Sequence, residues 1–217
     1  MHGYWAQFAK LAVAHILAVI SPGPDFAMVV RQSIAHGRRV AVWTAIGIGS
    51  AILIHVSYAL LGIGILLRTY PLAFAFVKYV GAAYLAYIGV RSLMSRPRTE
   101  MPSPSGPAAA EIAAPALPTP ARAWTTGVLT NVFNPKATLF FVAVFASLVD
   151  PRTPKLVEAG YGVWMSLSTM AWFALVATVF TRERMRRAFL RGGHWIDWAI
   201  GVVFIGLAAA LAFASLN

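Results

Sequence analysis

Two short segments of this sequence combine helix-breaking prolines with a charged side chain inside otherwise apolar runs. The first is Ser21-Pro22-Gly23-Pro24-Asp25 and the second is Asn131-Val132-Phe133-Asn134-Pro135-Lys136. Proline removes a backbone donor and clashes with the preceding turn, so each segment should open its helix and leave backbone groups unpaired. Opposite charges beside freed amides and carbonyls can bind a small polar molecule. The chemistry that these segments predict is therefore binding.

Catalytic arrangements are missing from the sequence. It has no His-Glu-x-x-His or Gly-x-Ser-x-Gly motif, and its seven acidic residues are scattered along the chain. The absence of cysteine excludes disulfides and thiolate metal sites. We therefore expect no enzyme activity, no metal and no cofactor. An intramembrane enzyme and a scaffold that does not transport remain as alternatives.

The composition predicts a membrane protein. Hydrophobic residues make up 59% of the chain and charged residues only 12%, and the mean hydropathy is +0.70. A soluble domain of this length could not bury so much apolar side chain, so lipid must be part of its solvent. The net charge of +11 lies in short clusters between apolar runs, which is typical of membrane loops rather than of nucleic-acid binding.

Apolar runs of about 20 residues can cross a bilayer, so they can be counted as spans. Three runs lack internal charges, and three more qualify only if an interior charge is tolerated, namely Asp25, Lys78 and Lys136. The six predicted spans are Val40 to Leu67, Ala159 to Thr181, Trp198 to Leu216, Trp5 to Val30, Leu72 to Val90 and Trp124 to Val149. The expected fold is thus all-α, with six transmembrane helices, of which the first and fourth are broken.

Residues 95–123 contain seven of the thirteen prolines and predict a flexible Pro/Ala-rich linker. The linker divides one membrane domain into three-helix halves, residues 1–94 and 124–217. Alternate loops hold twelve arginines on one side of the membrane and only four cations on the other. The arginine side, linker included, should be cytoplasmic, with both termini outside and the halves inverted as repeats.

Pairing the two halves sets Pro24 against Pro135 and hence Asp25 against Lys136. Proline-interrupted spans at corresponding places indicate the substrate site of a secondary transporter. Lys136 should lie about 18 Å inside its span, where it needs a carboxylate, carbonyls or a wet cavity. Two simpler readings stay open: the prolines could only kink the helices, and Asp25 could lie near the cytoplasmic surface.

Further motifs extend this pattern along nearly the whole chain. They are His36-Gly37-Arg38-Arg39, Gly81-Ala82-Ala83-Tyr84-Leu85, Gly89 and Gly127. Together with the two proline segments, they resemble the lysine exporter and homoserine/threonine exporter family of bacteria. The resemblance implies an amino-acid exporter of the cytoplasmic (inner) membrane, driven by the proton gradient and forming a homo-oligomer. It leaves the identity of the amino acid open.

A binding hypothesis follows for the head group of an amino acid. Asp25 would accept the α-ammonium group, while Lys136, Asn131, Asn134 and freed helix amides would hold the α-carboxylate. Without substrate, Asp25 and Lys136 could neutralise one another. Alternatively, Asp25 could take up a proton from outside, which would couple export to proton flow.

Four further polar side chains could each have either of two roles. The Ser21 hydroxyl could touch the substrate or only satisfy backbone groups at the break. Tyr84 could line the transport pathway or pack between helices. His15 and His55 could relay protons, but a hydrogen bond to a neighbouring helix is the favoured interpretation.

Overall fold

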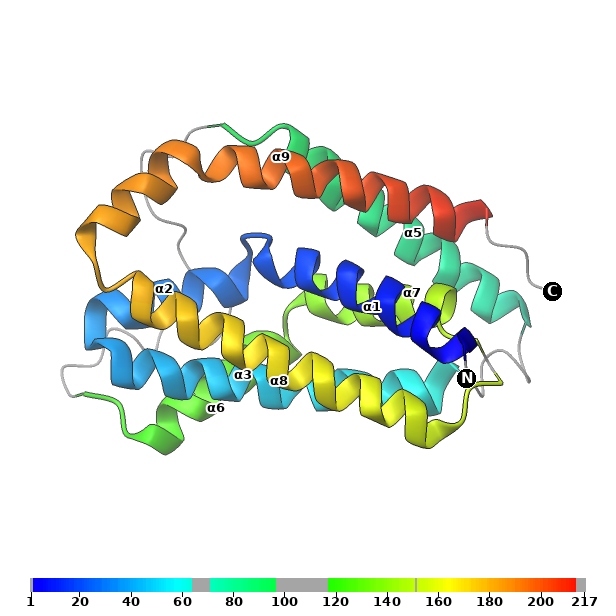
Figure 1. Cartoon of the computed structure of the whole chain (residues 1–217), viewed down its shortest axis with the longest axis horizontal. Helices are drawn as coiled ribbons and strands as arrows, with labels where there is room; N and C mark the ends of the chain where they lie inside the picture. The colour runs from blue at the N-terminus through cyan, green and yellow to red at the C-terminus, as the bar shows by residue number, and fades with distance from the viewer. Residues whose placement is uncertain (1, 64–70, 97–116, 151, 214–217) are drawn as a thin grey trace.

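The computed structural model describes residues 2–63, 71–96, 117–150 and 152–213, and all regular elements within them are helices. The elements are α1 (His2–Ile20), α2 (Pro24–His36), α3 (Arg38–Tyr58), the π-helical turn η1 (Ala59–Ile63), α5 (Pro71–Leu93), α6 (Pro120–Val132), α7 (Pro135–Leu148), α8 (Lys155–Val179) and α9 (Glu183–Phe213). The helices run roughly along the long axis of the molecule (Figure 1).

Several helices are long and apolar enough to cross a membrane. Within the described ranges these are α1, α3 and α8, and α6 with α7 forms a fourth candidate bent by 59° at its break. The chain is therefore an all-helical, multi-pass membrane protein. The predicted spans at 72–90 and 198–216 fall within α5 and α9 as far as these helices are described. The side chain of Lys78 lies outside the described part.

The predicted linker overlaps the start of α6, which begins at Pro120. The Thr119 hydroxyl accepts a hydrogen bond from the Arg122 amide at 3.3 Å and so caps the helix. Proline fits the first turn because an amide there has no intrahelical partner. Residues 97–116, which form most of the predicted linker, lie outside the described residues.

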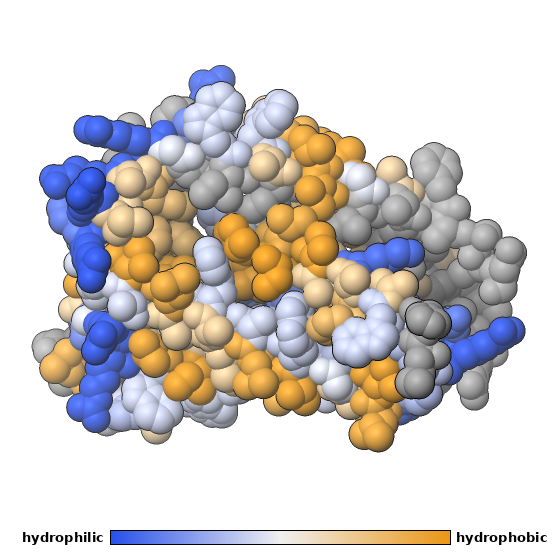
Figure 2. Space-filling model, in the orientation of Figure 1, coloured by the Kyte–Doolittle hydropathy of each residue, from blue (hydrophilic) through white to orange (hydrophobic). Residues whose placement is uncertain are grey.

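Helices α1 and α6 run in opposite directions along the molecule. In Figure 1, α1 begins at one end of the long axis, whereas α6 begins at the other. The α2–α3 and α8–α9 junctions share the end at which α6 begins, and Figure 2 shows hydrophilic side chains gathered there. We call this the arginine end, because Arg38, Arg39, Arg182 and Arg184 lie at these two junctions.

Glycines bring helices of the two halves into backbone contact. α3 packs on α6 and α8, and α5 packs on α9. A Cβ atom added to Gly47 of α3 would collide with the backbone of α6, and one added to Gly127 of α6 would collide with α3. Gly89 of α5 and Gly201 of α9 form a second reciprocal pair. Small residues allow this approach, which replaces hydrophobic burial as a source of packing in lipid.

The short helix α2 lies inside the bundle. Its residues 26–30 are all buried, and its apolar side chains pack against α3 and α8. Because α2 continues from α1 after the first break, this burial holds the break within protein rather than in lipid. Irregular backbone at membrane depth requires such surroundings.

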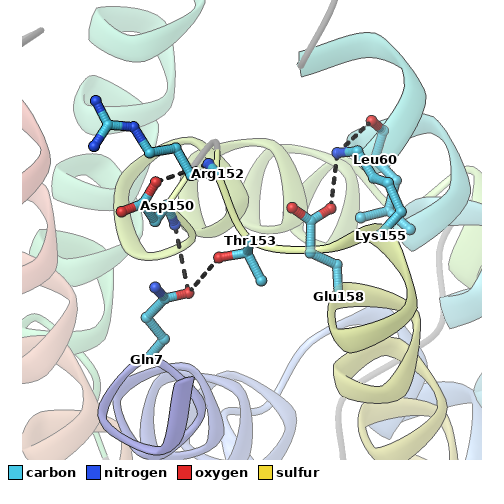
Figure 3. A network of polar contacts seen from close by, with 7 residues as sticks. All are labelled: Gln7, Leu60, Asp150, Arg152, Thr153, Lys155 and Glu158. Atoms are coloured by element: carbon cyan, nitrogen blue, oxygen red, sulfur yellow. Dashed lines mark hydrogen bonds and ion pairs between the residues drawn. The ribbon is translucent and has the colours of Figure 1, made fainter. Parts of the chain in front are cut away.

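A polar network lies at the end of the molecule where α1 begins (Figure 1 and Figure 3). The Gln7 side-chain oxygen accepts hydrogen bonds from the Thr153 hydroxyl at 3.0 Å and the Asp150 amide at 3.4 Å. Lys155 Nζ lies 2.9 Å from the Glu158 carboxylate and donates to the Leu60 carbonyl at 3.3 Å. These contacts connect α1, η1 and the α7–α8 turn.

Candidate functional site

The first break leaves carbonyls at the end of α1 without helical partners, among them those of Ala18 and Ser21. α1 ends at Ile20, and α2 begins at Pro24 after an extended Gly23. In a continuous helix the amide of residue 22 would donate to the Ala18 carbonyl, but Pro22 has no N–H. The opened backbone likewise separates the Ser21 carbonyl from the amide four residues on. Two acceptors therefore need donors from elsewhere.

The second break is shorter and capped by asparagine. α6 ends at Val132, and Pro135 is the first residue of α7. Asn134 caps α7, because its side-chain oxygen accepts a hydrogen bond from the Lys136 amide at 3.0 Å. Pro135 cannot donate to the Asn131 carbonyl, which accepts from the Asn134 amide at 3.0 Å and from His55 Nε2 at 3.2 Å.

Both breaks lie away from the ends of the long axis (Figure 1). Asp25 in the first turn of α2 and Lys136 in the first turn of α7 are therefore interior charges. The reading of Asp25 as a surface residue at the cytoplasmic face does not fit this position. An interior charge has to be matched by polar groups from the protein.

Lys136 supplies the donors that the first break lacks. Its Nζ donates to the Ser21 carbonyl at 2.8 Å and to the Ala18 carbonyl at 3.1 Å. These carbonyls end α1, so the cation also meets the negative end of the helix dipole. The side chain passes over Gly23, where an added Cβ would lie 3.4 Å from Lys136 Cδ. An ammonium group has three donors, so one remains beyond these two contacts.

The Asp25 carboxylate binds two side chains of the second break. Its Oδ2 accepts hydrogen bonds from Asn131 Nδ2 at 2.8 Å and from Asn134 Nδ2 at 3.1 Å. Each charge is thus satisfied by polar groups of the other break, amides for the carboxylate and carbonyls for the ammonium. Asp25 and Lys136 do not form a direct ion pair in this conformation.

The two charges line one small cavity, which also includes Ser21 and His15. Its volume is about 40 Å³. A buried water needs about 10–15 Å³ by this measure, so the cavity has room for a few waters and not for an amino acid. Three buried polar atoms on its lining residues lack a hydrogen-bond partner, namely Asp25 Oδ1, Asn131 Oδ1 and His15 Nδ1. The site is therefore small, and it keeps polar atoms that a ligand could bind.

The structure brings together five of the six predicted binding residues. Asp25, Lys136, Asn131, Asn134 and Ser21 all line the cavity. Ser21 contributes its backbone carbonyl to the contact with Lys136. The sixth, Tyr84, lies half-buried on α5 with its ring 6.3 Å from that of Tyr87 and does not line this cavity.

The two histidines bond to neighbouring helices, as favoured from the sequence. His15 Nε2 lies 3.1 Å from the Met165 carbonyl and 3.0 Å from the Thr169 hydroxyl, both on α8. His55 Nε2 lies 3.2 Å from the Asn131 carbonyl on α6. Its Nδ1 lies 2.6 Å from the Tyr58 hydroxyl, which is on the same helix as His55.

Sequence reasoning missed part of the site. The apolar walls come from Phe140, Phe141 and Phe173, which sit in apolar runs with no distinguishing signal. The Ala18 carbonyl could have been found, because Pro22 four residues later removes its partner. No cluster of three or more metal-ligating side chains occurs among the residues that the structure describes.

Comparisons with known proteins agree on one protein family. Residues 16–215 match a family model described as "LysE type translocator". The chain is similar to the threonine efflux proteins of Salmonella typhi and Escherichia coli K12, each 30% identical over 204 residues, which are 94% of this chain and 96% of the relative. It is also similar to a leucine efflux protein of Salmonella choleraesuis, 29% identical over 217 residues, 96% of this chain and 94% of the relative. No solved structure matches the chain.

Proposed function

The chain belongs to the LysE type translocator family, and on that basis we propose that it exports amino acids or related small zwitterions across the bacterial cytoplasmic membrane. Relatives named for threonine and leucine efflux support the substrate class. The observation that carries the proposal is the meeting of two broken helices around one cavity with a carboxylate and an ammonium on its walls.

These two charges match the two ends of a zwitterion. The unpaired Asp25 Oδ1 and Asn131 Oδ1 are acceptors and would bind the α-ammonium group. The remaining donor of Lys136 would bind the α-carboxylate. Asn134 would act indirectly, because its side chain is engaged with Asp25 and with the start of α7.

The size of the cavity implies a conformational change on binding. At about 40 Å³ the site must widen before an amino acid fits. Lys136 holds the end of α1 against α7 through two carbonyls, and a carboxylate would compete with those carbonyls for the ammonium. Substrate would therefore weaken a contact that keeps the two halves together, which is a differential interaction of the kind a transporter needs.

Amino-acid export would be coupled to proton entry through Asp25. Protonation of Asp25 from the outside would remove the negative charge that holds the α-ammonium and so release substrate outward. Deprotonation toward the cytoplasm would restore the binding site. Export would then be driven by proton flow into the cell.

The chain would cross the membrane six times, as two inverted three-helix repeats. The opposite directions of α1 and α6 and the matched breaks support it (Figure 1). The arginine end would face the cytoplasm, together with the linker, and both termini would lie outside. Exposed apolar side chains on α5, among them Leu72 and Phe76, would contact lipid or a second copy of the chain.

Transport by the purified protein tests the function. Proteoliposomes loaded with single radiolabelled amino acids should release some of them faster than protein-free vesicles, and an inward proton gradient should increase the rate. Absence of efflux for every amino acid, in protein shown to be folded and reconstituted, would contradict the proposal. Conversion of the loaded compound into a new product would instead favour an enzyme.

A further inference from the structure

A second, larger cavity lies beside the first break. Its volume is about 430 Å³, and it is bounded by the end of α1, α2, α8 and the first part of α9. Figure 2 shows this face hollowed between α9 and the α1–α2 segment, on the side of the break toward the arginine end. Its lining includes Pro22, Phe26, Trp172, Phe180, Phe189 and Gly192.

The lining of this cavity is almost wholly apolar. Trp172 is the one described lining residue whose side chain carries nitrogen or oxygen, and its Nε1 is buried without a hydrogen-bond partner. Indole N–H is a donor only, so it can meet a carboxylate or a water but not an ammonium group. A polar side chain placed here would lose hydrogen bonds to water without replacement.

One side chain separates the apolar cavity from the polar one. Phe26 lines both, and it follows Asp25 directly at the start of α2. Its ring packs against Phe180 and Phe189, with centroid distances of 5.3 and 4.9 Å. The break contributes to both cavities too, because Ser21 and Gly23 line the polar one and Pro22 lines the apolar one. A molecule whose head group binds at Asp25 therefore has an apolar space next to it.

We propose that this apolar cavity receives the side chain of the exported molecule, so that the substrates are amino acids with large apolar side chains, from leucine to phenylalanine in size. The inference rests on the proposed export function. Ligand cavities in proteins usually measure about 300–1,000 Å³, so the volume is sufficient. Phe26 would have to turn aside for the head group and the side chain to occupy the two cavities together.

Gly192 allows the cavity to be filled without disturbing a helix. A Cβ atom added at this position meets nothing within 4 Å, so Gly192→Phe can extend into the cavity. Gly206 lies on the same helix, also has open space around an added Cβ and does not line the cavity. Gly206→Phe is therefore a matched control for the change in helix propensity and bulk.

The test measures efflux of leucine, phenylalanine and serine from proteoliposomes. One methylene in an apolar pocket changes discrimination by about tenfold or more, so the wild type should export leucine at least about ten times faster than serine. Gly192→Phe should lower the ratio of leucine to serine efflux roughly tenfold, and Gly206→Phe should leave it unchanged. Size-exclusion chromatography checks that both variants are folded.

The wild-type protein alone already tests the proposal, through its preference for leucine over serine. Equal efflux of serine and leucine would overturn the apolar side-chain pocket while leaving amino-acid export intact, whereas no efflux of any amino acid would overturn export itself. A bound lipid is the competing occupant. Loss of copurifying phospholipid in Gly192→Phe with an unchanged leucine-to-serine ratio would assign the cavity to lipid and reject the proposal.

Discussion

The two breaks both lie in the interior and contact one another, yet they are built from different chemistry. The first has two prolines around Gly23, no side-chain cap on α2 and two carbonyls at the end of α1 that accept from Lys136. The second has one proline, and Asn134 caps α7 while its amide group reaches Asp25. One break therefore offers acceptors and the other offers donors, so the halves complement rather than copy one another.

This complementarity explains why a direct ion pair is unnecessary. A buried ion pair satisfies charge but still leaves other polar atoms of both groups to be paired. Here each charged group is held by the backbone or amides of the opposite break and keeps one binding position open. The same arrangement holds the two helices together and leaves Asp25 Oδ1 and one Lys136 donor for a ligand.

The largest effect should come from Lys136→Met, which keeps a similar side-chain volume but removes the donor. The Ala18 and Ser21 carbonyls would then be buried without partners. Removing one member of a buried, hydrogen-bonded charged contact costs about 2–5 kcal/mol, so efflux should fall roughly thirtyfold or more. Efflux from proteoliposomes, normalised to reconstituted protein, measures this. Wild-type rates in the variant would show that the two breaks are not coupled through Lys136.

Asp25→Asn should have the next largest effect, because it retains shape and loses charge. Hydrogen bonds to charged groups contribute about 1.5–3 kcal/mol, against about 1 kcal/mol for neutral ones, so a loss of about 0.5–2 kcal/mol should lower efflux roughly twofold to thirtyfold. If Asp25 also carries the proton, the residual efflux should no longer respond to a proton gradient. Exchange of labelled for unlabelled substrate, which needs no net proton movement, should be less affected. A variant that keeps its full response to the gradient would remove Asp25 as the coupling residue.

The sequence was enough to predict both breaks and the residues that meet there. Proline has a local effect on the helix, and an interior charge such as Lys136 must find polar partners in any fold. The partners themselves depended on the packing of helices far apart in the chain. Asn131 and Asn134 were expected to face a carboxylate of the substrate, whereas the structure has them donating to Asp25. The apolar cavity is formed by ordinary core residues such as Val179 and Ala188, whose types carry no signal.

Asn134→Ala should lower the stability of the protein more than Gly23→Ala, because only Asn134 caps a helix with its side chain. Losing the side-chain cap of α7 should cost about 1 kcal/mol of stability, and the Asp25 carboxylate loses a donor as well. Gly23 has an extended backbone, and an added Cβ would make only ordinary contacts with Lys136, so Gly23→Ala should change stability by less than about 1 kcal/mol. Thermal unfolding in detergent measures both. Equal destabilisation by the two variants would contradict the difference in capping.

The smallest effect should come from Lys155→Met, the same substitution at a lysine that makes similar contacts in different surroundings. Lys155 also donates to a backbone carbonyl, that of Leu60, and it pairs with Glu158 at 2.9 Å (Figure 3). The Lys155 side chain is 63% exposed, whereas that of Glu158 is only 4% exposed, so water replaces the contacts of the lysine and the loss should affect stability more than transport. Efflux should stay within about twofold of the wild type. Lys136→Met and Lys155→Met remove the same group at different places, so a large loss in both would mean that lysine removal itself, and not the interior position between the breaks, impairs export.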